Sequence, residues 1–86
     1  METISNGLRI IYNLIYKGDL ENALWEINDL EQFIMQNAPA LMDKHHLKTY
    51  FTKWRNRLIR SHNQNLNLLL EEIEHLAIKF ENIIIN

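Results

Sequence analysis

Apolar residues recur at steps of three and four along this chain, the spacing of one face of an α-helix. Leu8, Ile11 and Ile15 set the pattern near the start and predict a first helix over residues 4–17. A second helix is predicted over residues 20–36. Its apolar positions alternate in the same steps, as Leu20, Ala23, Ile27, Leu30 and Ile34. The connection is so short that we expect the two helices to form an antiparallel hairpin.

Two further helices are predicted after a break at Pro39. Proline has no amide proton and disfavours a helical conformation in the residue before it, so one helix ends near residue 36 and another begins near residue 39. The third predicted helix covers residues 39–60, with an apolar seam of Leu47, Phe51, Trp54 and Leu58. The fourth covers residues 62–84, with a seam of Leu66, Leu69, Ile73, Leu76, Phe80 and Ile83.

Residues 61–65 leave the connection between the last two helices open. Ser61 and Gln64 have the spacing of a capping box, which would start a separate fourth helix. Alternatively, Ile59 and His62 continue the last apolar seam backward, and one helix of about 40 residues would run from the proline to the end. We favour the break. The expected fold is therefore all-α, an antiparallel helical bundle of three or four helices.

The composition supports a single small helical domain over residues 1–86. Two Gly and one Pro disfavour turn-rich β folds, and the absence of Cys excludes disulfides and thiolate metal sites. Without Cys there is no reason to place the protein in an oxidising compartment, so we expect it to be cytoplasmic. No apolar run approaches the ~20 residues of a membrane helix, so we expect no membrane partner. A domain of this size buries a limited core, and we expect a dimer or a place in a complex.

Charge is segregated along the chain although the formal net charge is only −2. Residues 44–70 contain six Lys and Arg residues and no Asp or Glu. Residues 1–43 contain two basic and seven acidic residues, and residues 71–86 contain one basic and four acidic residues. The basic stretch also contains large aromatic residues, so charge and apolar surface coincide there, as they do at many binding surfaces.

Three interpretations of this basic stretch remain open. It would pack beside the acidic second and fourth helices within the bundle, bind an acidic partner protein, or contact nucleic acid through phosphates and stacked bases. A pI near 6.0 and the lack of a known reader motif favour a protein over nucleic acid.

We therefore predict a non-catalytic interaction module, such as an adaptor, inhibitor or co-chaperone-like regulatory subunit. Its partner would be a protein with an acidic surface or a second copy of the chain. The alternative is a nucleic-acid-binding regulator that uses residues 44–60. The predicted partner-binding residues are Lys48, Tyr50, Lys53, Trp54, Arg55 and Arg60.

No group of residues predicts catalysis, a cofactor or a metal. The chain has two serines, no cysteine and no Gly-rich phosphate loop, so we expect that it is not an enzyme. Glu72 and His75 have the Glu-x-x-His spacing of helical di-iron sites, but such a site needs two copies of the motif. The adjacent His45 and His46 would point about 100° apart on a helix and could not hold one ion together.

Two local resemblances concern the start of the basic stretch. One pattern resembles the repeat by which certain spindle-pole and centriole linker proteins bind centrin, and it consists of Ala38, His46, Leu47, Phe51, Trp54 and Arg55. The run from His46 to Phe51 also resembles a helical segment of the theta subunit, which binds the proofreading exonuclease of the bacterial replicative polymerase. Both resemblances are confined to this segment, and we assign the chain to neither family. They imply only that such a helix docks into a protein groove.

Overall fold

A computed structural model describes residues 2–60 and 66–83 and confirms the all-α prediction. Over these residues the chain forms helices and no strands. The helices are α1 (Glu2–Tyr16), α2 (Leu20–Asn37), α3 (Pro39–Lys44), α4 (Leu47–Ile59) and α5 (Asn67–Ile83). None of the helices within these ranges is long and apolar enough to cross a membrane.

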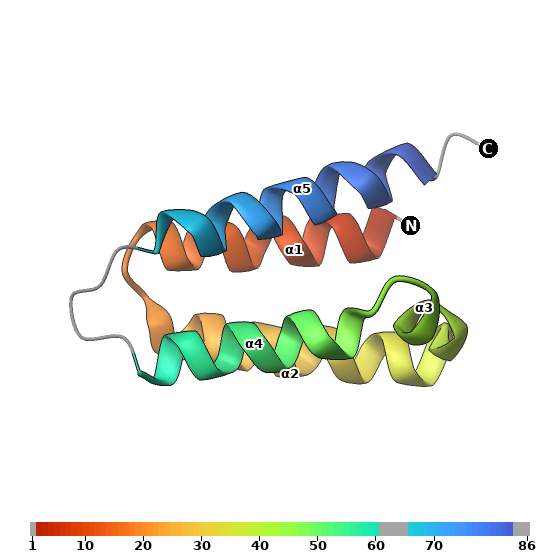
Figure 1. Cartoon of the computed structure of the whole chain (residues 1–86), viewed down its shortest axis with the longest axis horizontal. Coiled ribbons are helices and arrows are strands. Elements are labelled where there is room, and N and C mark those ends of the chain that lie inside the picture. Colours follow the sequence, from red (N-terminus) through yellow and green to blue (C-terminus); the bar gives the residue numbers. More distant parts are fainter. Residues whose placement is uncertain (1, 61–65, 84–86) are drawn as a thin grey trace.

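The four longer helices run alternately in opposite directions and form an antiparallel bundle (Figure 1). α1 packs against both α2 and α5, and α2 packs against α4. The short α3 lies at one end, where it contacts α2 and α4 and reverses the chain between them. The bundle is elongated, measuring 40 × 21 × 18 Å along its principal axes.

The turn between α1 and α2 is formed at Gly18 and Asp19. Gly18 has φ +86°, a left-handed conformation that costs glycine little because it has no Cβ. Asp19 then caps α2, because its side chain accepts a hydrogen bond from the backbone amide of Asn22 at 3.4 Å. The predicted helical hairpin is therefore confirmed.

The prediction of one helix over residues 39–60 is wrong, because the chain breaks between α3 and α4. His46 adopts a left-handed conformation with φ 54° at the break. Met42 and Leu47 explain why a break is needed, since both are buried although they are five residues apart. On a continuous helix these two side chains would point about 140° apart. The break lets both of them face the same core.

The predicted break between the last two helices is confirmed, because α4 and α5 are separate helices that run in opposite directions. α5 begins at Asn67, five residues later than the sequence pattern predicts. The proposed capping box of Ser61 and Gln64 falls outside the described residues.

The buried residues of the predicted apolar seams form the core, and Leu20 and Leu66 pack against it partly buried. On α4, all four seam residues are buried, and Phe51 meets Trp54 edge to face with ring centroids 5.5 Å apart. The largest fully buried side chains come from all four long helices and are Trp54, Phe51, Phe80, Leu8, Ile11, Ile27, Ile34, Leu47 and Ile73. Because the seam of α4 faces inward, the polar residues of this helix are presented on its outer side.

Candidate interaction surface on α4

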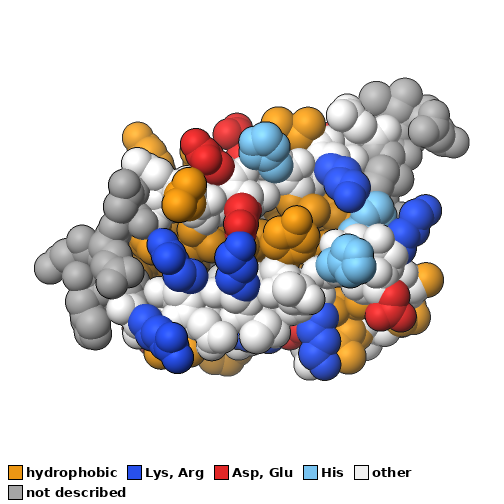
Figure 2. Space-filling view, viewed as in Figure 1, with side chains coloured by type: hydrophobic (Ala, Val, Ile, Leu, Met, Phe, Trp, Pro, Cys, Tyr) orange, Lys and Arg blue, Asp and Glu red, His pale blue; other side chains and the backbone are white. Residues whose placement is uncertain are grey.

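The outer side of α4 forms a shallow groove of about 600 Å³, which we name the α4 surface. It consists of Lys48, Thr49, Thr52, Lys53, Asn56, Arg57 and Arg60. Lys and Arg side chains gather over this helix in the space-filling view (Figure 2). α4 itself contains no Asp or Glu, so any neutralisation of its charge must come from another helix or another molecule.

Lys53 joins the α4 surface to α5. Its Nζ lies 2.6 Å from Oε2 of Glu72, and the indole Nε1 of Trp54 donates a hydrogen bond to Oε1 of the same carboxylate at 3.0 Å. Partial burial on its own would raise the pKa of Glu72, but the hydrogen bonds from Lys53 and Trp54 outweigh it and lower this pKa. Glu72 therefore stays ionised at neutral pH and links α5 to α4.

Arg55 joins α4 to α2 on the other flank. Its Nη1 lies 2.7 Å from Oε1 of Glu31 and 3.3 Å from Oδ1 of Asn28. The side chains of the ion pair are only 23% and 14% exposed. Arg55 therefore has an internal partner, and the interpretation that basic residues pack beside acidic helices holds for Arg55 and Lys53.

Arg55→Met is expected to lower the free energy of unfolding by about 1 kcal/mol, because a partly shielded ion pair and its hydrogen bonds are lost. Chemical denaturation followed by circular dichroism measures this change. Glu31→Gln should cost a similar amount, and the double variant should cost less than the sum of the two. Additive effects in this double-mutant cycle would show that the ion pair contributes nothing to stability.

The predicted partner-binding residues thus occupy different environments. Trp54 is fully buried and offers no surface to a partner, while Tyr50 is half-buried beside it, with ring centroids 5.9 Å apart. Lys48 and Arg60 are exposed at opposite ends of α4.

Arg57 lines the α4 surface, although the sequence prediction did not include it. It lies four residues after Lys53 and three before Arg60, and this helical spacing was the signal that could have identified it.

The function has to be argued from these residues, because no family model matches the chain and neither a curated protein nor a solved structure matches it. Within the described ranges, no three His, Asp or Glu side chains are grouped so that they could hold a metal ion. The described surface shows basic residues along α4 and exposed apolar side chains. These are features of binding surfaces.

Proposed function

We propose that this protein is a non-catalytic interaction module that binds an acidic surface of a partner protein through the α4 surface. The observation that carries the proposal is a row of cations on the outer side of one helix that contains no acidic residue. Lys48 and Arg60 are exposed near its two ends, separated by about 18 Å at the helical rise per residue. This row would complement an extended acidic surface and steer its approach.

The environment of the aromatic residues favours a protein partner over single-stranded nucleic acid. Proteins that bind single strands usually stack bases on exposed aromatic rings. Of the aromatic residues in the basic stretch, Phe51 and Trp54 are fully buried, and Tyr50 is half-buried against Trp54. The alternative function, nucleic-acid binding by residues 44–60, would therefore depend mainly on phosphate contacts.

The test is a charge reversal of the two exposed end residues, Lys48→Glu with Arg60→Glu. Affinity purification of the tagged protein from its native source, followed by mass spectrometry, identifies the binding partner, and a titration then measures the affinity. We expect the double variant to weaken binding about tenfold or more at low salt. The matched control is Lys17→Glu with Lys44→Glu, which changes the net charge equally at exposed positions outside α4.

Two results would contradict the proposal. One is that the double variant and the control bind the partner equally well. The other is that generic duplex DNA binds the wild-type protein with an affinity that falls steeply with salt and is lost in the Lys48→Glu, Arg60→Glu variant. This second result would support the nucleic-acid alternative instead.

A further inference from the structure

A second surface groove lies between α1 and α2 and has the opposite charge to the α4 surface. We name it the α1–α2 groove, and its volume is about 430 Å³. It is lined by Thr3, Asn6, Gly7 and Ile10 of α1 and by Glu26, Asp29, Leu30 and Phe33 of α2. Its charged lining residues are two carboxylates, and its remaining lining is apolar or neutral.

Two apolar side chains that line the groove are partly exposed. Ile10 is 48% exposed and Phe33 is 39% exposed. Between them, α1 and α2 approach closely at Gly7, where an added Cβ would lie only 2.8 Å from Cδ1 of Leu30. Leu30 can therefore pack directly against the backbone of α1, because Gly7 has no side chain.

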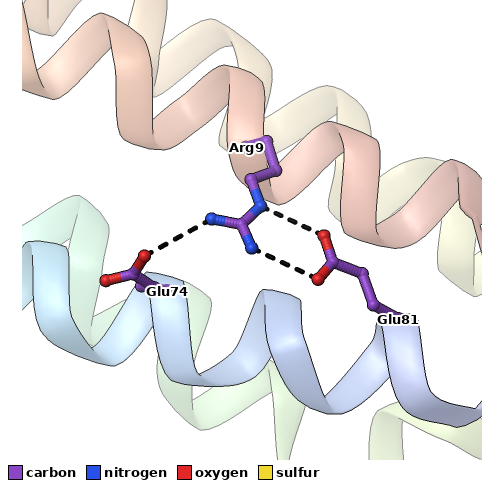
Figure 3. A network of polar contacts seen from close by, with 3 residues as sticks. All are labelled: Arg9, Glu74 and Glu81. Carbon is purple, nitrogen blue, oxygen red and sulfur yellow. Dashed lines mark hydrogen bonds and ion pairs between the residues drawn. The ribbon is translucent and has the colours of Figure 1, made fainter.

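The acidic residues of the α1–α2 groove are not neutralised from within the described part of the chain. Neither Glu26 nor Asp29 has an ion-pair partner there. Arg9, the basic residue within α1, is directed to α5 instead (Figure 3). Its Nε and Nη2 donate hydrogen bonds to Glu81 at 3.1 and 3.2 Å, and its Nη1 lies 3.5 Å from Glu74.

The α1–α2 groove and the α4 surface lie on different flanks of the molecule. On α2, Glu31 pairs with Arg55 of α4, whereas Phe33 lines the groove. Glu31 and Phe33 are two residues apart on the helix, so their side chains point in directions about 160° apart. One molecule therefore presents an acidic apolar groove on one flank and a basic helix on another.

We infer that the α1–α2 groove of one molecule binds the α4 surface of a second copy. The charges are complementary, with Glu26 and Asp29 on one side and the exposed cations Lys48 and Arg60 on the other. This inference rests on the proposed function, since it names a second copy as the acidic partner of the α4 surface.

The inferred contact joins two different surfaces, so it is heterologous and can add further copies head to tail. It is also weak, because exposed ion pairs and a few partly exposed apolar side chains must offset the entropy cost of association. We expect assembly at protein concentrations of about 100 μM and above, and we expect salt to dissolve it.

Sedimentation velocity and light scattering of the purified full chain test the inference at low and high salt. The weight-average mass should rise with concentration at low salt and fall to that of a monomer in about 1 M NaCl, where charges are screened within about 3 Å. Lys48→Glu with Arg60→Glu should abolish the rise, and so should Glu26→Lys with Asp29→Lys. Mixing these two variants should restore assembly, because each supplies the charge that the other has reversed.

The matched control, Lys17→Glu with Lys44→Glu, should assemble like the wild type. A monomer at every concentration, or a mixture of the two reversed variants that stays monomeric, would overturn the inference. The proposed function is tested separately. If self-association is absent but the reversal on α4 still weakens binding of a foreign acidic protein, only the inference fails. If the purified chain assembles but Glu26→Lys with Asp29→Lys has no effect, the groove is not the contact.

Discussion

Trp54→Ala is expected to lower the free energy of unfolding by about 3–5 kcal/mol, the range for removing a fully buried large aromatic side chain. The ring is completely buried and contacts Phe51 and Tyr50, with centroids 5.5 and 5.9 Å away. Its Nε1 also donates to Glu72, so the substitution removes one of the contacts between α4 and α5. Because small domains are stable by only about 5–15 kcal/mol, this loss removes a large share of the stability.

Trp54→Phe separates packing from the hydrogen bond. It keeps an aromatic ring in the core but removes the donor to Glu72, and we expect it to cost about 1–2 kcal/mol. Urea denaturation followed by circular dichroism compares the variants without depending on tryptophan fluorescence. Equal stability of the Ala and Phe variants would mean that the core does not depend on the ring of Trp54.

The apolar periodicity predicted most of the fold because it reports which side of each helix is buried. Phe51 and Trp54 were predicted from their spacing to face the core, and both are fully buried. The break after α3 was not predicted, because no Gly or Pro follows Pro39 to mark it. Met42 and Leu47 cannot face one core from a continuous helix, so their five-residue spacing contained the missing signal.

The candidate site was less predictable because the role of a charged residue depends on its partner. In the sequence, nothing distinguishes Lys53 and Arg55 from Lys48 and Arg60, since all four are basic residues of the same stretch. In the structure, Lys53 pairs with Glu72 and Arg55 pairs with Glu31. These partners are 19 and 24 residues away, so only the packing of α4 against its neighbours selects them. Local charge patterns therefore indicated a basic helix without showing which cations are used inside the bundle.

His45 connects the break after α3 to the end of α5. Its side chain is buried and meets Phe80 at an angle of 65°, with ring centroids 5.0 Å apart. Its Nδ1 has no hydrogen-bond partner among the described residues. Burial lowers the pKa of His45 from its ordinary value of 6.5, and the nearby Lys79, Lys44 and His46 lower it further. At neutral pH the folded chain therefore holds this imidazole in its neutral form.

This lowered pKa makes stability depend on pH. As pH falls below 6.5, the unfolded chain protonates His45 before the folded chain does, so the free energy of unfolding decreases. The decrease stops once pH has fallen through the lower pKa of the folded state. In His45→Leu, this contribution to the pH dependence should be absent. The stability that Glu72 contributes is lost only at more acidic pH, because Glu72 is a carboxylate with a lowered pKa.

Phe80→Ala should change both the free energy of unfolding and its dependence on pH. Removing this fully buried ring is expected to cost about 3–5 kcal/mol. It should also admit water to His45, which raises the pKa of His45 toward its ordinary value and shrinks the decrease in stability below pH 6.5. Phe80→Leu keeps apolar cover over His45 and should retain more of that decrease. Urea denaturation at several pH values measures the change in stability and its pH dependence, and a histidine titration by NMR measures the pKa of His45. An unchanged pKa of His45 in Phe80→Ala would show that Phe80 does not control the protonation of His45.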